Sequence, residues 1–490
     1  MTPSIKNLGE LKKSGYQSKS IKDELRDNLM KHLESGNTTF EGIVGYENTV
    51  LPQLFSAILS KHNINLLGLR GQAKTKIARS LVQLLDEWMP IVGGSEINDD
   101  PLQPMSRFAS ELIEEKGDDT PISWVHRDRR FFEKLATPDV TVADLIGDVD
   151  PIKAANLKLS YADDRVIHYG MIPRANRCIF VINELPDLQA RIQVSLFNIL
   201  QEGDIQIRGF QLRLPLDLQF IFTANPEDYT NRGSIVTPLK DRIGSQILTH
   251  YPKDVVLAKQ ITTQEAKISE NAEKNVVVPE LARDLIEHIS FEARENDYVD
   301  AKSGVSARMS ITAFENLMST AELRLLMSKD KSTVLRVSDI LGIIPAMTGK
   351  LELVYEGEQE GAESVAKILI GEAVKDLFSI KFKEIKKLRK STDYDEFDEV
   401  VEWFARGGKF QLETNATNDE YTATLNAIPA LDKILEKYQP SIDESEKLFY
   451  KEFVLWGMVE HKMLDKQKYQ ERFDFEDTLL SGIKDDFSEN

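Results

Sequence analysis

Residues 68–75 read Gly-Leu-Arg-Gly-Gln-Ala-Lys-Thr, the composition and order of a phosphate-binding loop. Glycines in such a loop let backbone N–H groups close around phosphate oxygens, and the start of the next helix adds positive potential. Lys74 is then placed to reach the β- and γ-phosphates of a nucleotide, and the Thr75 hydroxyl to bind Mg²⁺. Ala73 stands where the last glycine is expected, and alanine tolerates the start of a helix. For this segment alone, a strand, a turn and a helix with a surface lysine is the competing interpretation.

The predicted nucleotide contacts come from this loop and from a segment upstream of it. Residues 43–45 include a glycine-flanked apolar pair before a helix, where an adenine can rest, although an ordinary turn fits equally well. The full set of predicted cofactor-binding residues is Ile43, Val44, Gly45, Gly68, Arg70, Gly71, Gln72, Ala73, Lys74, Thr75 and Lys76.

A second chemical motif, Asn183-Glu184, follows the apolar run 178–182. The run predicts a strand buried on both faces, and open α/β sheets bind ligands at the carboxyl ends of such strands. In ATPases with a phosphate-binding loop this strand ends in Asp-Glu, where the Asp holds the Mg²⁺ shell and the Glu polarises the attacking water. Asn183 replaces the Asp, so we expect it to contact Mg²⁺ through a water molecule, with weaker Mg²⁺ binding or slow turnover. On this basis Asn183→Asp is expected to speed turnover at limiting Mg²⁺. A buried strand with a polar end is the competing interpretation.

Three further polar residues are candidates for the same chemistry. Asn225 follows a predicted strand at 218–223, where its amide can position the attacking water beside Glu184. Arg242 follows Asp241, and a surface ion pair is its simpler interpretation. Arg308 lies near a predicted helix start, which is unfavourable for the helix dipole. For Arg308, a role toward a ligand and a satisfied surface arginine both remain open.

The elements that must position these residues are predicted from hydrophobic periodicity. A strand at 64–67 precedes the loop, and a helix with an apolar face follows it. A strand near 124–125, a hairpin-type insertion within 140–172 and a β-hairpin at 203–215 are also expected. The other predicted helices span 21–33, 51–59, 108–115, 189–200, 254–263, 279–296, 306–327, 334–347, 363–379 and 428–465.

Composition excludes several classes of protein. The net charge of −19 at pH 7 argues against an extended nucleic-acid surface, which needs a basic face. The single cysteine, Cys178, excludes a disulfide framework and a thiolate metal cluster. No apolar run is long enough to span a bilayer, and residues 1–16 lack the apolar core of a signal peptide. We therefore expect a cytoplasmic protein without a membrane span.

In order and spacing these motifs resemble the AAA+ ATPases. The closer resemblance is to the clade with an insertion in the second helix, which includes the magnesium-chelatase ATPase subunit and the MoxR-type ATPases. It is carried by residues 68–75, 175–177, 203–215, 225–227 and 239–242, and it covers roughly residues 40–330. The runs 183–188 and 224–230 look most like bacterial proteins labelled magnesium chelatase outside pigment synthesis, in which Asn at the position of Asn183 is usual.

The resemblance implies an α/β fold: a phosphate-binding-loop AAA+ core with a parallel sheet, then an α-helical lid and a C-terminal helical region. The implied domains are a helical extension at 1–38, the nucleotide-binding domain at 39–250 with the helix-two insertion near 140–172, the lid at 251–350 and a helical domain at 351–490. By analogy Asn225 is the sensor-one residue, Arg308 the sensor-two arginine and Arg242 an arginine finger.

The resemblance also implies ATP and Mg²⁺ as cofactors and a hexameric ring of identical chains. A von Willebrand A domain partner, if used, is expected to be a separate protein. The implied function is an ATPase that remodels a partner protein. The alternatives are the motor subunit of a magnesium or cobalt chelatase and a slow nucleotide-dependent scaffold, the last motivated by Asn183.

Overall fold

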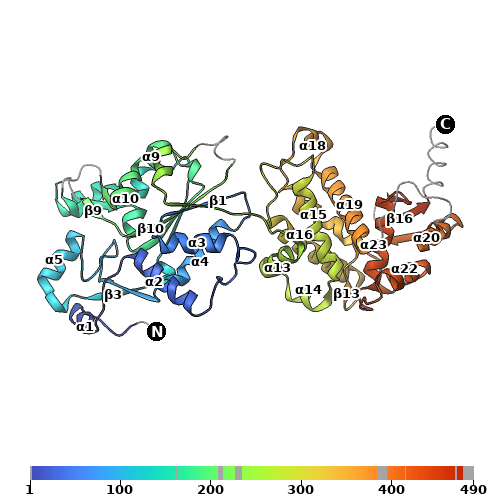
Figure 1. The fold of residues 1–490 in the computed structure, drawn as a ribbon, viewed down its shortest axis with the longest axis horizontal. Helices are drawn as coiled ribbons and strands as arrows, with labels where there is room; N and C mark the ends of the chain where they lie inside the picture. The colour runs from blue at the N-terminus through green and yellow to red at the C-terminus, as the bar shows by residue number, and fades with distance from the viewer. Residues whose placement is uncertain are drawn as a thin grey trace. The chain divides into compact units, whose positions relative to one another are not determined.

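The computed structural model describes residues 3–160, 163–207, 213–226, 234–382, 394–413, 415–469 and 472–477 (Figure 1). The chain forms two compact units, residues 1–251 and 252–490. No helix among the described residues is both long and apolar enough to cross a membrane.

The first unit is built on a five-stranded parallel sheet in the order β11-β1-β10-β7-β4. The strands are β11 (Ser245–Leu248), β1 (Ile64–Leu67), β10 (Leu218–Ala224), β7 (Cys178–Asn183) and β4 (Phe131–Leu135). The predicted strands at 64–67, 178–182 and 218–223 are confirmed as β1, β7 and β10. Strands β4 and β11 were not predicted.

Helices cover both faces of this sheet, because successive residues of a strand point to opposite faces. In β7, Ile179 and Val181 belong to one apolar cluster, which also includes residues of α2 (Ile21–Glu34), α3 (Val50–Leu59) and α4 (Lys74–Ser80). Phe180 and Ile182 belong to the cluster on the other face. That cluster includes residues of α9 (Ala190–Ser195), α10 (Phe197–Glu202) and α12 (Thr237–Arg242). The central strands are therefore the middle layer of three, as their continuous apolar runs predicted.

Three antiparallel pairs extend from this core. Within 140–172, β5 (Gly147–Val149) pairs with β6 (Ile167–Tyr169), which confirms the predicted hairpin-type strands, and α7 (Pro151–Leu157) lies between them. The hairpin predicted at 203–215 is confirmed by the pairing of β8 (Asp204–Gln206) with β9 (Arg213–Pro215), and its Arg-Gly turn lies outside the described residues. The third pair is β2 (Trp88–Val92) with β3 (Ile122–His126), and α5 (Arg107–Lys116) lies between them in the sequence.

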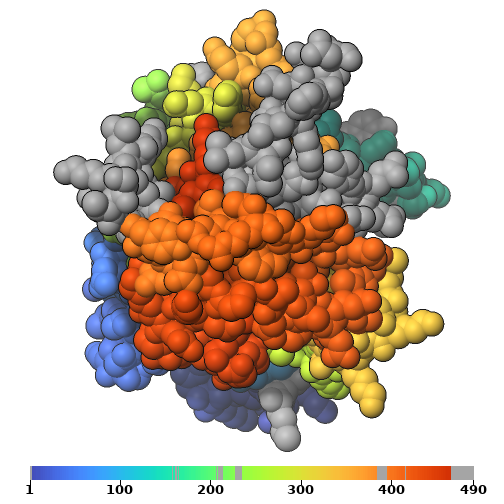
Figure 2. All heavy atoms as spheres, turned by 90° about the vertical axis from the view of Figure 1, so that its right-hand side faces the viewer, coloured from blue at the N-terminus to red at the C-terminus, as the bar shows by residue number. Residues whose placement is uncertain are grey.

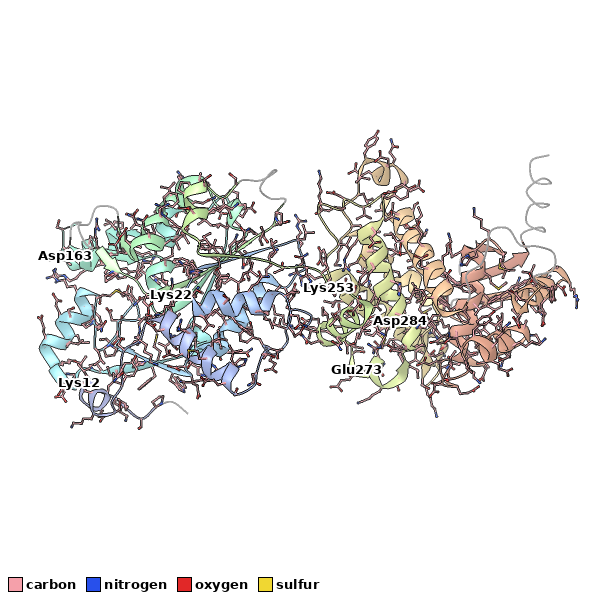
Figure 3. The ribbon with its side chains drawn as sticks, viewed as in Figure 1. Lys12, Lys22, Asp163, Lys253, Glu273 and Asp284 are labelled. Carbon is pink, nitrogen blue, oxygen red and sulfur yellow. The ribbon has the colours of Figure 1, made fainter. Side chains whose placement is uncertain are left out.

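The N-terminal helix α2 is tied to the core through buried polar groups as well as apolar contacts. Arg130 is 1% exposed and donates to both carboxylate oxygens of Glu24 at 2.6 Å. The Asp217 carboxylate accepts from the Ile21 backbone N–H at 2.6 Å, at the start of α2. Lys22, labelled in Figure 3, lies on the same first turn.

The second unit is mainly helical and shares one apolar core from Ala272 to Leu464. The helices predicted at 254–263, 279–296, 306–327 and 363–379 are confirmed as α13 (Val255–Glu265), α15 (Glu280–Glu295), α16 (Arg308–Ser328) and α19 (Ala362–Lys381). Asp284 of α15, labelled in Figure 3, pairs with Lys259 at 2.7 Å and with Lys381 at 2.8 Å. The division between residues 350 and 351 remains a prediction.

Two helices expected in this unit are broken in the structure. Instead of one helix at 334–347 there is β13 (Thr333–Val334), a 3-10 segment at Val337–Ile343 and α17 (Ile344–Thr348). The region 428–465 forms α22 (Ala430–Tyr438) and α23 (Lys447–Glu460) and then enters a strand. That strand, β15 (Leu464–Tyr469), belongs to an unpredicted antiparallel sheet with β14 (Phe410–Glu413) and β16 (Arg472–Asp477).

The remaining helices of the second unit complete its helical part. They are α14 (Glu270–Asn275), α18 (Tyr355–Glu360), α20 (Glu396–Ala405) and α21 (Asn418–Asn426). Figure 2 shows the C-terminal part of the chain in orange and red, where it forms one continuous face toward the viewer.

Candidate functional site

The predicted phosphate-binding loop connects the end of β1 to the start of α4. The Gly68 backbone N–H donates to the Ala224 carbonyl at 3.1 Å, which joins the loop to the end of β10. A Cβ on Gly68 would lie 2.0 Å from Thr249 Oγ1 and 2.3 Å from Gln72 Oε1. Only glycine therefore fits at position 68 without moving these side chains. Gly71 has a φ of 73°, a second position that favours glycine.

Lys74 points back across this loop. Its side chain is 7% exposed, and its Nζ donates to the carbonyl oxygens of Gly68 and Leu69, the latter at 3.0 Å. The ammonium group is thus held at the loop itself and not out in solvent. Thr75 and Lys76 follow in the first turn of α4, and Arg70 lies exposed on the loop.

Ala73 adopts the left-handed conformation, with φ 53° and ψ 19°. A side chain in this region costs roughly 1–2 kcal/mol relative to the right-handed one. The sequence-based view that alanine tolerates this position therefore needs correction: the position favours glycine, and alanine occupies it under strain.

Three side chains that the sequence analysis did not single out anchor the loop. The Tyr46 hydroxyl donates to the Gln72 carbonyl at 3.0 Å, and the Tyr251 hydroxyl donates to the Arg70 carbonyl at 2.9 Å. The Thr249 hydroxyl donates to Gln72 Oε1 at 2.7 Å. Burial raises the pKa of Tyr46, so this hydroxyl stays protonated and remains a donor. Their positions could not be read from the sequence, because these contacts join residues far apart in the chain.

The segment 43–45 reaches the loop through Tyr46. Ile43 is buried in the apolar cluster that includes α3, Val44 is half-buried, and Gly45 has a φ of 84°. The Gly45 N–H donates to Glu47 Oε1 at 3.0 Å. The structure thus brings the segment beside the loop, and contact of these residues with an adenine stays a prediction.

The ends of β7 and β10 meet beside the loop. Asn183 Oδ1 accepts from the Thr223 hydroxyl at 3.1 Å and from the Thr75 hydroxyl at 3.5 Å. Glu184 is half-buried, with a left-handed φ of 54°, and its backbone N–H donates to Thr223 Oγ1 at 3.2 Å. Thr223 therefore links both residues of the Asn-Glu motif to β10.

Asn225 follows β10 directly and is 2% exposed. The parallel register places Leu67 beside Ala224, and Ile182 beside Phe222. The phosphate-binding loop, Glu184 and Asn225 therefore lie at the same edge of the sheet, at the carboxyl ends of three adjacent strands.

The two predicted arginines are on other elements, α12 and α16. Arg242, at the end of α12, donates to Gln201 Oε1 at 2.8 and 3.0 Å and to the Pro238 carbonyl at 2.7 Å. Its guanidinium lies 5.0 Å from the centre of the Phe197 ring. These contacts are to an amide, a carbonyl and a ring, so a surface ion pair does not describe them. Arg308 is an exposed residue at the start of α16 in the second unit, and its role at a nucleotide stays a prediction.

Comparison with known proteins identifies this part of the chain. Residues 122–243 match the family described as AAA domain (dynein-related subfamily). These residues form an AAA domain. The match includes the Asn183-Glu184 motif, Asn225 and Arg242, whereas the phosphate-binding loop lies upstream of it. For these residues the match agrees with the family that the motifs of the chain resemble.

Solved structures that resemble the chain are distant from it. A candidate ATPase from Cytophaga hutchinsonii ATCC 33406 is 17% identical over 74% of this chain and 97% of that one, with a TM-score of 0.30. A magnesium chelatase complex of subunits BchI and BchD is 19% identical over 66% of this chain and 99% of that one, with a TM-score of 0.36. NtrX from Brucella abortus is 13% identical over 67% and 58%, with a TM-score of 0.33. A search of curated proteins gave no match.

The polar groups at the AAA site fit a nucleotide accompanied by Mg²⁺. Thr75 and Asn183 present a hydroxyl and an amide oxygen, and Mg²⁺ prefers oxygen ligands. Among the described residues, no group of three or more His, Cys, Asp or Glu side chains forms a metal site of its own.

Proposed function

We propose that this protein is an ATP-driven motor that couples hydrolysis at subunit interfaces to remodelling of a partner protein. The observation that carries the proposal is the convergence of the loop with Lys74, Glu184 and Asn225 at one edge of the parallel sheet. A site with a phosphate cradle, a carboxylate base and a buried amide is suited to phosphoryl transfer to water.

Each residue has a separate task in this proposal. Lys74 places a positive charge on the β- and γ-phosphates, and Thr75 provides a hydroxyl ligand for Mg²⁺. Bound Mg²⁺ would neutralise part of the negative charge of the phosphates. Glu184 orients and polarises the attacking water, and Asn225 holds that water in line by hydrogen bonding.

The assembly is part of the proposal. Arg242 is assigned as an arginine finger that acts on the nucleotide of a neighbouring copy, and Arg308 as the second sensor. This arrangement requires a homo-oligomeric ring, which we propose has six subunits. A separate von Willebrand A domain protein is the proposed partner. The cytoplasm is the proposed location, because ATP is available there.

Two alternatives use the same site. The motor subunit of a magnesium or cobalt chelatase is suggested by the motif runs at 183–188 and 224–230. A slow nucleotide-dependent scaffold is suggested by the neutral side chain of Asn183. Tetrapyrrole-pathway genes beside the gene for this chain would favour the chelatase, and a von Willebrand A gene would favour the remodeller.

The first experiment measures nucleotide binding and phosphate release for three variants. Lys74→Ala should lose binding of a fluorescent ATP analogue, because the charge at the loop is gone. Glu184→Gln should bind the analogue and lose phosphate release. Lys116→Ala, an exposed lysine at the end of α5, is the matched control and should behave as wild type.

Unchanged affinity in Lys74→Ala would refute the phosphate-loop assignment. Wild-type turnover no faster than that of Glu184→Gln would favour the scaffold. To identify the client, Glu184→Gln loaded with ATP serves as bait in a pull-down, because stalled hydrolysis should prolong contact with the partner.

A further inference from the structure

Asn183 has a charged neighbour that the sequence did not reveal. Glu133 lies on β4, the strand adjacent to β7, and its side chain is one-quarter exposed. Its Oε1 accepts a hydrogen bond of 2.5 Å from Asn183 Nδ2. Its Oε2 accepts from Arg79 at 2.6 Å. Arg79 follows Thr75 by one turn of α4. A series of hydrogen bonds therefore starts at Thr75, passes through Asn183 and Glu133, and returns to α4 at Arg79.

This contact fixes the orientation of the Asn183 amide. A carboxylate can only accept hydrogen bonds, so the Asn183 NH₂ group must face Glu133. The amide oxygen must then face the hydroxyls of Thr75 and Thr223, as observed. The opposite orientation would place the amide oxygen against the carboxylate, which is repulsive. Glu133 therefore presents the oxygen of Asn183 toward the predicted Mg²⁺ ligand Thr75.

Glu133 also contributes a negative charge at this place. The residue expected here in related ATPases is an aspartate, which combines an oxygen with a charge, whereas Asn183 has the oxygen alone. The Glu133 carboxylate is one hydrogen bond farther from Thr75. Its partner Arg79 is 64% exposed, and exposed ion pairs are weakened by solvent and salt. The carboxylate is thus held in place by Arg79 without being strongly neutralised.

We infer that Glu133 is a positioning residue for the cation that accompanies the nucleotide, and that Asn183 and Glu133 together do the work of one aspartate. This inference rests on the proposed function, because it assumes that nucleotide binds with Mg²⁺ at the loop. It reverses the expectation drawn from the sequence for Asn183→Asp. An aspartate at 183 would place two carboxylates in direct contact, and their repulsion should turn the new carboxylate away from Thr75. This loss of orientation should weaken Mg²⁺-dependent binding.

The test compares the affinity for a fluorescent ATP analogue in Mg²⁺ and in EDTA, with the full chain. Glu133→Gln keeps the shape of the side chain and removes its charge. We expect it to reduce the Mg²⁺-dependent gain in affinity by about 10–100-fold, the usual effect of losing an outer-shell partner of a metal ligand. Affinity in EDTA should stay at the wild-type value. Glu111→Gln is the matched control, because Glu111 also pairs with an arginine, Arg107, at 2.7 Å.

A reciprocal exchange separates this role from a structural one. Asn183→Asp should lose Mg²⁺-dependent affinity, and the double variant Asn183→Asp with Glu133→Gln should recover it, because one carboxylate and one amide are again in contact. If Glu133 only packed against its neighbours, the double variant would not recover Mg²⁺-dependent affinity.

Three results would overturn the inference. They are an unchanged Mg²⁺ dependence in Glu133→Gln, an equal loss of affinity in Mg²⁺ and EDTA, and tighter Mg²⁺-dependent binding in Asn183→Asp alone. Failure of the wild-type chain to bind nucleotide in either condition would instead refute the proposed function. The two ideas therefore fail in distinguishable ways.

Discussion

Ala73, just before α4, and Glu184, just after β7, both have left-handed backbones, with φ of 53° and 54°. The two residues differ in what their side chains can contribute. Glu184 has a carboxylate that the proposed chemistry requires, so the strained backbone at this position holds a group with a function. Ala73 brings an exposed methyl group that has no chemical role at a phosphate. The strain at position 73 should therefore be removable.

Ala73→Gly should leave stability unchanged or raise it by up to about 1.6 kcal/mol. Relief of a left-handed side chain contributes roughly 1–2 kcal/mol, and the greater freedom of glycine in the unfolded chain offsets about 0.4–1 kcal/mol of it. The measurement is the midpoint of urea unfolding. Ala155→Gly in α7 is the control, because that alanine is exposed within a helix, where the same change costs about 1 kcal/mol. If Ala73→Gly is as destabilising as Ala155→Gly, the backbone at position 73 is not strained.

At the scale of elements, the sequence predicted the strands that carry continuous apolar runs. Strands β7 and β10 are buried throughout, and their runs of apolar residues predict this burial. Strand β4 was missed because Glu133 and Lys134 interrupt its apolar residues. The role of Glu133 was missed for the same reason, since only the pairing of β4 with β7 brings it to Asn183. The helix predicted at 428–465 likewise overlaps the start of the polar strand β15.

The loop and the Asn-Glu motif were recognisable because each is contiguous in the sequence. The anchors Tyr46, Thr249 and Tyr251 were not, because their contacts with the loop span from 26 to 181 residues of sequence. Such long-range contacts follow from packing and leave no local pattern. A residue's type and spacing thus predicted the chemical groups of the site but not the groups that hold them in place.

Helix α2 should be attached to the core in a pH-dependent way. Burial raises the pKa of Asp217 from 3.8 to about 6, and the nearby arginines Arg177 and Arg130 only partly oppose this. Because its pKa is higher in the folded state, the contribution of this carboxyl to stability is fully present below about pH 4 and is lost as the pH rises through about 6. The loss is at most on the order of 3 kcal/mol. Hydrogen-exchange protection of α2 should accordingly decrease over this range.

Asp217→Asn tests this directly, because an amide oxygen can still accept from the Ile21 N–H without becoming charged. At pH 7.5 the variant should show greater protection of α2 than wild type, and at pH 4 the two should be equal. Asp118→Asn is the control, because Asp118 is an exposed carboxyl paired with Lys12. This variant should not increase the hydrogen-exchange protection of α2 at pH 7.5. Equal protection in wild type and Asp217→Asn at pH 7.5 would show that burial of this carboxyl does not weaken α2.

At the scale of the whole molecule, the proposed motor needs residues from more than one copy of the chain. The loop, Glu184 and Asn225 are joined through neighbouring strands of one unit, whereas Arg242 contacts Gln201 and Phe197 of α10. Arg242 is half-buried and its contacts are at the surface, so its removal should change stability little. Its loss should therefore report on function, and this makes it a suitable probe of assembly.

Arg242→Ala should keep nucleotide binding and lose most hydrolysis, because an arginine finger contributes roughly 10³–10⁵ in rate where it has been measured. Arg191→Ala on α9, an exposed arginine of the same unit, should retain wild-type activity.

Mixing Arg242→Ala with Glu184→Gln chains should restore part of the activity, because some interfaces then combine an intact Glu184 with an intact Arg242. Mixing Lys74→Ala with Glu184→Gln should restore no activity. Lys74 and Glu184 belong to the same site of one chain, so neither kind of chain in this mixture has a complete site. If the first mixture co-assembles and stays inactive, or if Arg242→Ala hydrolyses ATP normally, Arg242 does not act across an interface in this protein.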